Sequence, residues 1–254
     1  MELKSNIAAV TGGASGLGAA TAEYFASQGC KVALFDLDQE RGEKHAASIG
    51  GLFVKVDVTD ETSVNAGLDA VESWAGGPAR ILVNCAGIAI GSKTVGKHGP
   101  HPLDAFEKVI KINLIGTFNC TRLAAARMCE ADPLSCGDRG VIISTASVAA
   151  FDGQIGQVAY GASKAAVAGM TLPIARDLSG NAVRVCTIAP GIFMTPMMAG
   201  MPENVQQALG ESVPYPKRLG EPSEYAKLAA HIVDNQYLNG ETIRIDGSIR
   251  MPPR

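Results

Sequence analysis

The sequence predicts an α/β fold in which one doubly wound parallel sheet of about seven strands carries helices on both faces. Short apolar runs rich in β-branched residues alternate with longer helix-like stretches over the whole length, which is the pattern of βαβ units. Hydrophobic residues make up 46% of the 254 residues and charged residues only 19%, so the chain can bury a large core. No repeat or linker divides the sequence, and we expect residues 1–254 to form a single domain.

Each expected strand is a short apolar run, and a helix-like stretch separates it from the next. The strands are predicted at residues 7–11, 31–35, 52–56, 81–84, 141–145, 183–189 and 242–245. The helices are predicted at residues 17–28, 39–48, 61–74, 104–129, 160–178 and 222–234. Because right-handed crossovers make such a sheet doubly wound, ligands are expected at the carboxyl ends of the strands.

Three stretches interrupt this alternation. Residues 91–102 and 129–140 are polar, contain Gly and Pro, and are expected to be surface loops. Residues 193–220 are rich in methionine and proline and follow the sixth strand, at the edge where a ligand should lie. We therefore predict a substrate loop at about 192–216 that closes over the ligand. The alternative is that its methionines only fill gaps in a packed helix.

The composition argues against several classes of function. The net charge of −3 gives no attraction to nucleic acid or to anionic membranes, and no apolar run approaches the roughly 20 residues of a membrane span. The spacing of the six cysteines and four histidines matches no metal site, so we expect free thiols and no metal. We expect a cytoplasmic protein, or one of the mitochondrial matrix if a presequence has been removed.

A glycine-rich loop follows the first strand directly and opens the first helix. In its sequence TGGASGLG, Gly12 permits a tight turn, Gly16 lets the backbone approach a pyrophosphate, and Gly18 allows close packing of helix on strand. The free N–H groups at the start of the helix would bind phosphates. The spacing GxxxGxG differs from the common GxGxxG, but the strand before it and the helix after it indicate a Rossmann fold that binds a dinucleotide.

A carboxylate at the end of the second strand predicts which dinucleotide binds. Asp36 lies 18 residues past the last glycine of the loop and could accept hydrogen bonds from both hydroxyls of the adenosine ribose, whereas it would repel a 2′-phosphate. No Lys or Arg at 12–18 or 37–38 would attract that phosphate. NAD is therefore predicted over NADP. The alternative is that Asp36 is an ordinary solvated residue at a strand end.

Four polar residues predict a catalytic site at the same edge of the sheet. Tyr160 and Lys164 lie four apart in an expected helix and share one face, although such a pair is common by chance. A phenol has an ordinary pKa of about 10, and the Lys164 ammonium together with the positive nicotinamide ring would lower that pKa. Ser147 follows the fifth strand and could bond the substrate oxygen. Asn113, in the long helix before that strand, could fix a water that links Lys164 to solvent.

Together these motifs resemble the short-chain dehydrogenase/reductase superfamily. The resemblance rests on TGGASGLG, Asp36, NCAG at 84–87, Asn113, Ser147, YGASK at 160–164 and PG at 190–191, and it covers essentially the whole chain. It implies an oxidoreductase with an Asn-Ser-Tyr-Lys tetrad, frequently a homotetramer, without a metal. The full set of expected cofactor-binding residues is Gly12, Ser15, Gly16, Leu17, Gly18, Asp36, Asp57, Val58, Asn84, Ala86, Gly87, Tyr160, Lys164, Pro190, Gly191, Ile192 and Thr195.

Less generic stretches resemble one family within that superfamily, the type 2 3-hydroxyacyl-CoA dehydrogenases. They include STASVAAF at 144–151, GQIGQ at 153–157 and NGETIRIDGSIRM at 239–251, and the loop 91–102 falls where that family carries an insertion. The resemblance implies NAD-dependent oxidation of short-chain or 2-methyl-branched 3-hydroxyacyl-CoA to 3-ketoacyl-CoA, and the reverse reduction. The alternative enzyme is a dehydrogenase of hydroxysteroids or other bulky secondary alcohols. A nucleotide-binding sensor without activity is disfavoured because Tyr160 and Lys164 are both present.

Gln154 is the candidate residue for recognition of the substrate. It lies seven residues after Ser147, and its amide could bond a thioester carbonyl, so that Ser147, Gln154 and Tyr160 together would contact an acyl-CoA ester. On spacing alone it could equally be an exposed loop glutamine, and the family resemblance favours the ligand role. For the implied homotetramer, helices 104–129 and 160–178 carry small residues that could pack between subunits or against their own sheet.

Overall fold

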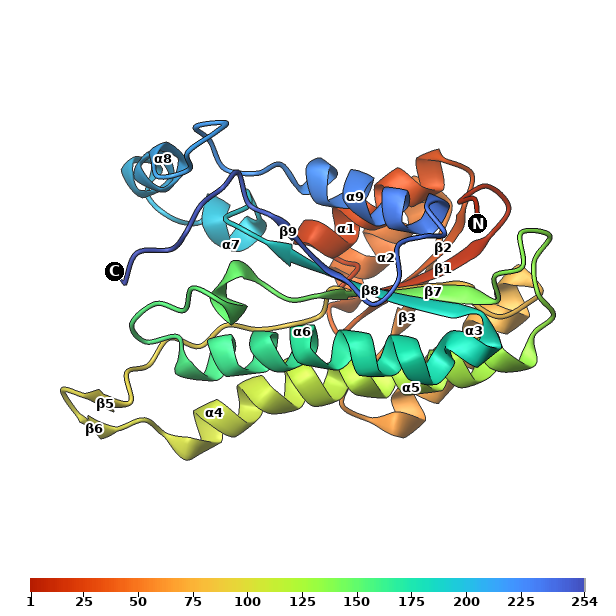
Figure 1. Cartoon of the computed structure of the whole chain (residues 1–254), viewed down its shortest axis with the longest axis horizontal. Helices are drawn as coiled ribbons and strands as arrows, with labels where there is room; N and C mark the ends of the chain where they lie inside the picture. Colours follow the sequence, from red (N-terminus) through yellow and green to blue (C-terminus); the bar gives the residue numbers. More distant parts are fainter. Residues whose placement is uncertain (254) are drawn as a thin grey trace.

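A seven-stranded parallel sheet forms the centre of the computed structural model, which describes residues 1–253 (Figure 1). The strands are β1 (Ile7–Thr11), β2 (Lys31–Asp36), β3 (Leu52–Lys55), β4 (Ile81–Asn84), β7 (Gly140–Thr145), β8 (Val183–Pro190) and β9 (Thr242–Ile245). Their order is β3-β2-β1-β4-β7-β8-β9, and all neighbouring pairs are parallel. The predicted doubly wound α/β fold is confirmed, and no strand boundary differs from its predicted position by more than one residue.

Helices cover both faces of the sheet, because successive side chains of a strand point to opposite sides. The helices of one face are α1 (Gly16–Ser27), α2 (Gln39–Ile49) and α9 (Pro222–Asp234), and those of the other are α3 (Glu61–Ala75), α5 (Thr117–Glu130) and α6 (Val158–Leu178) (Figure 1). In β1, Ala8 and Val10 belong to the core beneath the first group, whereas Ala9 between them belongs to the core beneath the second. The alternation thus gives the protein two hydrophobic cores, one on each face.

The long helix expected at 104–129 is not one regular helix. A π-helical segment, Lys111–Gly116, joins α4 (Leu103–Ile110) to α5. The turn of a π-helix is wider than that of an α-helix. Over one such turn the spacing of apolar residues changes too little for the π-helical segment to be predicted from the sequence. The segment carries Asn113, and π-helical turns inside α-helices are frequent at functional sites.

Two of the expected loops contain short regular elements. Residues 91–102 include a hairpin of β5 (Val95–Gly96) and β6 (Gly99–Pro100), which extends beyond the start of α4 (Figure 1). The predicted substrate loop includes α7 (Pro196–Ala199) and α8 (Glu203–Glu211). The sequence did not reveal these elements, because the two-residue strands, the four residues of α7 and the nine residues of α8 are all shorter than the window in which periodicity is detectable.

Candidate active site

The segments after β1 and β4 meet at the carboxyl edge of the sheet, where the strand order reverses. The Thr11 hydroxyl, at the end of β1, accepts hydrogen bonds from the backbone N–H groups of Cys85 and Ala86, each at 3.1 Å. These bonds tie the glycine-rich loop to the segment after β4. In doubly wound sheets, a ligand binds at this point of reversal. Thr11 is the first residue of the glycine motif. The sequence did not show that its hydroxyl acts as an acceptor, because the donors lie more than 70 residues further along the chain.

The glycine-rich loop has the geometry that its sequence predicts. Gly12 has a φ of +64°, and a Cβ atom there would lie 2.9 Å from the nitrogen of Ala86. A Cβ at Gly18 would collide with the carbonyl oxygen of Gly12, so α1 packs closely on the end of β1. Gly16 also has a positive φ, of +56°, but its Cβ position is open, with Thr195 and Pro196 no closer than 3.7 Å. Gly16 thus lies next to Thr195, while the approach of its backbone to a pyrophosphate, with Ser15 and Leu17, stays a prediction.

The Asp36 carboxylate lies against this loop. One of its oxygens accepts a hydrogen bond from the N–H of Ala14 at 3.0 Å, and the other accepts one from the N–H of Asp38 at 3.1 Å. These bonds hold the Asp36 carboxylate beside the glycine-rich loop. This is the position from which it was predicted to bind the adenosine ribose. Asp57 lies two residues beyond the end of β3, and its carboxylate accepts hydrogen bonds from the N–H and hydroxyl of Thr59.

Several other predicted cofactor residues are engaged with the rest of the chain. The Asn84 side chain is buried and donates to the hydroxyl of Thr121 at 3.1 Å, so it points into the core. The Val58 carbonyl accepts a hydrogen bond from the Asn119 amide at 2.9 Å. Pro190, Gly191 and Ile192 continue from the end of β8, and a Cβ at Gly191 would lie 2.9 Å from the Cα of Asp246.

Lys164 is buried beside the end of β7. Its ammonium donates a hydrogen bond to the carbonyl of Thr145 at 2.7 Å, and desolvation lowers its pKa to about 8. A Cβ at Gly87 would lie 3.6 Å from this ammonium, which places the segment after β4 next to the lysine. The Thr145 carbonyl fixes the lysine, and sequence gives no signal for it because every residue has a carbonyl.

Tyr160 and Ser147 lie on the same side of the site as Lys164. The Lys164 Nζ is 5.8 Å from the centroid of the Tyr160 ring. Desolvation raises the pKa of Tyr160 above its ordinary value, and a hydrogen bond with the Ser147 hydroxyl offsets part of this rise. The surrounding protein therefore raises the pKa of Tyr160, with desolvation as the largest cause, and does not lower it. The further lowering expected from the nicotinamide ring stays a prediction. Tyr160 is a protonated phenol near pH 7.

Asn113 joins three parts of the site. Its side-chain amide accepts from the N–H of Ile88 at 2.8 Å and donates to the carbonyl of the same residue at 2.9 Å. It also donates to the Ser163 hydroxyl at 3.0 Å, so it pins the segment after β4 to α6. Its role as the residue that fixes a water stays a prediction, since these three bonds already engage both ends of the amide.

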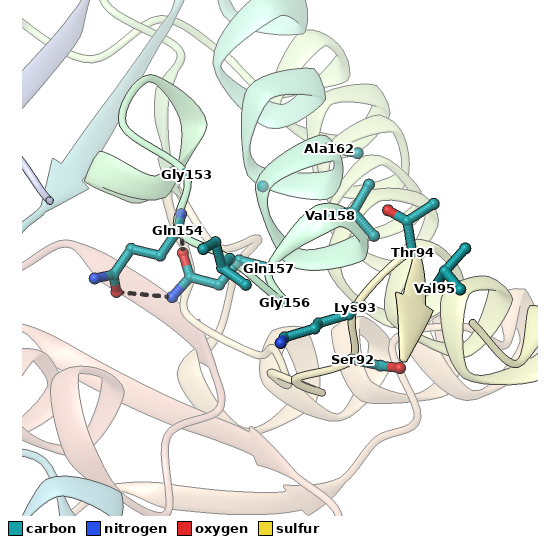
Figure 2. A pocket seen from close by; sticks show the side chains of 12 residues that line it. Ser92, Lys93, Thr94, Val95, Gly153, Gln154, Gly156, Gln157, Val158 and Ala162 are labelled. Atoms are coloured by element: carbon teal, nitrogen blue, oxygen red, sulfur yellow. Dashed lines mark hydrogen bonds between the residues drawn. The ribbon is translucent and has the colours of Figure 1, made fainter. Parts of the chain in front are cut away.

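Gln154 lies beside a cavity of about 640 Å³ between residues 92–95 and the loop 153–158 (Figure 2). Its amide nitrogen donates to the carbonyl of Pro252 at 3.0 Å, and its amide oxygen faces the amide nitrogen of Gln157 at 3.4 Å. The Gln154 side-chain amide is therefore partly engaged in hydrogen bonds. These bonds use its oxygen and one of its two N–H groups, and the second N–H group takes part in neither.

Residues 1–253 hold neither a metal-binding cluster nor a membrane-spanning helix. This part of the chain brings no three His, Cys, Asp or Glu side chains into an arrangement that could hold a metal ion. None of its helices is both long and apolar enough to cross a bilayer. Its six cysteines are free thiols.

Comparison with known proteins identifies the family. The sequence model of the short chain dehydrogenases matches residues 6–206. The chain is 55% identical to the 3-hydroxyacyl-CoA dehydrogenase type-2 of Drosophila melanogaster, over 99% of this chain and 100% of that protein, and 51% identical to that of Homo sapiens, over 99% and 97%. It matches the crystal structure of 3-hydroxyacyl-CoA dehydrogenase type-2 from Mycobacterium avium with a TM-score of 0.94 at 41% identity, over 98% of each chain. The predicted resemblance is confirmed: the chain is an oxidoreductase of the short chain dehydrogenase family, whose dehydrogenases typically use a nicotinamide cofactor.

Proposed function

We propose that this enzyme interconverts short-chain or 2-methyl-branched 3-hydroxyacyl-CoA and 3-ketoacyl-CoA with NAD(H). The observation that carries the proposal is the end-to-end similarity to proteins named 3-hydroxyacyl-CoA dehydrogenase type-2, at 51% and 55% identity in two animals. The arrangement of Ser147, Tyr160 and Lys164 at the carboxyl edge of the sheet supports the chemistry.

The residues around the glycine-rich loop fit a dinucleotide. The open position at Gly16 and the N-terminus of α1 would hold the pyrophosphate, and the Asp36 carboxylate would bind the adenosine ribose. When bound, NAD(H) supplies or accepts the hydride.

The catalytic residues would act on the substrate oxygen. Tyr160 keeps its proton near pH 7, because desolvation raises its pKa, so it can donate that proton to the oxygen as the ketone is reduced. The Ser147 hydroxyl holds the same oxygen. Lys164, with a pKa of about 8, is still mainly an ammonium at pH 7 and stabilises the phenolate that remains. In the oxidation direction, the same phenolate takes the proton back.

Gln154 is proposed to hold the thioester carbonyl. It lies beside the 640 Å³ cavity, and the second N–H of its amide would serve as the donor. The methionine-rich substrate loop at 192–216 would cover the acyl chain, since thioether side chains adapt to a branch. We also propose a homotetramer. Three large apolar side chains stay exposed in the helical layer of α5 and α6, namely Ile115 of the π-helical segment, Phe118 of α5 and Leu172 of α6. A cytoplasmic location stays a prediction from sequence.

The substrate is tested by comparing turnover of three compounds with NADH or NAD. We expect acetoacetyl-CoA and its 2-methyl homologue to be turned over at kcat/KM values at least about tenfold above that of a hydroxysteroid, because only they offer a carbonyl to Gln154. Loss of NADH absorbance at 340 nm, or its gain with the steroid, gives the rates. A higher kcat/KM for the steroid would make the enzyme a dehydrogenase of bulky secondary alcohols.

Asp36 should determine the choice between NADH and NADPH. The wild type is expected to prefer NADH in kcat/KM by at least about tenfold, since the carboxylate repels the 2′-phosphate and bonds the ribose hydroxyls. The double variant Asp36→Ala, Leu37→Arg should reverse that preference, because position 37 is 60% exposed and can present a guanidinium to the phosphate. Leu37→Arg alone is the control and should still prefer NADH. Equal use of both cofactors by the wild type would refute the role of Asp36.

A further inference from the structure

Arg244, on β9, is the centre of a charge cluster that the chemistry described above does not use. Its guanidinium forms ion pairs with Asp152 at 2.6 Å and with Asp246 at 2.7 Å, and it donates to the carbonyl of Ile249 at 3.0 Å. The guanidinium carbon also lies 5.4 Å from the centroid of the Phe151 ring. One side chain thus holds residues that are almost 100 positions apart in sequence.

The cluster joins the loop after the catalytic serine to the C-terminal segment. Phe151 and Asp152 open the loop 151–157, which carries Gln154. In the middle of this loop, the N–H of Ile155 donates to the carbonyl of Pro253 at 3.0 Å, and the side-chain amide of Gln154 donates to the carbonyl of Pro252 at 3.0 Å. The loop is therefore held to the C-terminal half of the chain at its start by charges and at its middle by hydrogen bonds to backbone carbonyls.

The ion pairs are protected enough to hold the loop. The side chains of Arg244, Asp152 and Asp246 are only 22%, 20% and 9% exposed, whereas ion pairs on an open surface are strongly screened. A guanidinium that contacts two carboxylates and a carbonyl also fixes their relative directions, which an ammonium would not do.

The catalytic serine itself is held independently of this cluster. The N–H of Ala146 donates to the carbonyl of Ile188 in β8 at 2.8 Å, and the Ser147 hydroxyl accepts from the N–H of Ala149 at 3.1 Å. Loss of the cluster should therefore release the loop beyond Phe151 while Ser147 stays in place.

We propose that Arg244 is a positioning residue: through Asp152 and the C-terminal segment it fixes the loop 151–157 and thereby the Gln154 amide that receives the acyl thioester. This inference rests on the proposed function for the identity of the substrate. The juxtaposition predicts that Arg244 governs the binding of the acyl-CoA ester and leaves binding of the nicotinamide cofactor unaffected.

The test uses Arg244→Gln and the milder, nearly isosteric Asp152→Asn, which should fold even if the first does not. Amide hydrogen exchange in loop 151–157, above all at Ile155, should become at least about tenfold faster in both variants, because the bond to Pro253 opens more often. The KM for acetoacetyl-CoA should rise at least about tenfold, with kcat within about threefold of wild type and the Kd for NADH within about twofold. Asp152→Glu should return both readouts toward wild type.

Arg41→Gln is the matched control, since it removes the same charge from an exposed pair with Asp38 on α2. It should leave the exchange of loop 151–157 and the KM unchanged. Unchanged exchange in both Arg244→Gln and Asp152→Asn would overturn the inference, as would kcat and NADH affinity that fall together with an unchanged KM. If hydrogen exchange in the loop rises in the variants but the wild type does not reduce acetoacetyl-CoA at all, the proposed function is wrong. The role of Arg244 in fixing the loop 151–157 would still be supported, but not its link to the acyl-CoA ester.

Discussion

Tyr160→Phe should lower kcat for the reduction of acetoacetyl-CoA by about 10²- to 10⁴-fold, which is the usual contribution of a positioned general acid. The substitution removes the hydroxyl that donates the proton and keeps the ring that packs beside Lys164. The Kd for NADH should therefore change by less than about twofold, because binding does not need the proton. Initial rates at 340 nm and quenching of cofactor fluorescence measure the two quantities.

Tyr237→Phe is the matched control for this variant. Tyr237 is 99% exposed and has no part in the site, so its hydroxyl should be dispensable for turnover. If Tyr160→Phe kept more than about a tenth of the wild-type rate, Tyr160 would not be the proton donor.

Arg184→Met should cost about 3–5 kcal/mol of unfolding free energy, the largest effect on stability that we expect from one substitution. Arg184 is buried in β8 and pairs with the buried Asp138 at 3.2 Å. Its guanidinium also donates to four carbonyls at and just beyond the C-terminal end of α9, namely those of Ile232, Val233, Asn235 and Leu238. Its loss leaves the buried Asp138 carboxylate with only the more distant Met1 ammonium, at 3.7 Å, as an ion-pair partner, and it leaves several carbonyls without a donor. The thermal midpoint should fall by about 10 °C.

A second substitution separates the two causes. Asp138→Asn in the Arg184→Met background should recover part of the lost stability, since it removes a buried negative charge that has lost its nearer partner. Arg41→Met, at the exposed pair on α2, is the control and should change stability by less than about 0.5 kcal/mol. A loss below about 1 kcal/mol in Arg184→Met would show that the buried pair is not needed for the fold.

The sheet was predictable because its inner strands, β2, β1, β4, β7 and β8, are buried on both faces. Each strand is then a nearly continuous apolar run, and such runs stand out from the helices between them. The long helix before β7 was predicted as regular, because the π-helical segment Lys111–Gly116 keeps side chains of helical type. The hairpin β5–β6 was missed because its two strands are only two residues long, too short for an alternating pattern to be detected.

The site residues were predictable where a motif ties residue type to local backbone. Gly12 and Gly18 have the close approaches that their positions between strand and helix require. The sequence could not show the pKa of Tyr160, because the shift depends on burial by elements remote in sequence. The contact between Arg244 and Asp152 was hidden for the same reason: the two residues meet only after β9 has paired with β8.

The central claim is that this site transfers a hydride between NAD(H) and the C3 carbon of an acyl-CoA ester. It is tested most directly by reducing acetoacetyl-CoA with NADH that carries two deuterium atoms at C4 and analysing the product by mass spectrometry. We predict 3-hydroxybutyryl-CoA with one deuterium at C3 from the wild type, and at least about a hundredfold less of it in the same time from Tyr160→Phe. Unlabelled product, or no product from the wild type, would contradict the claim.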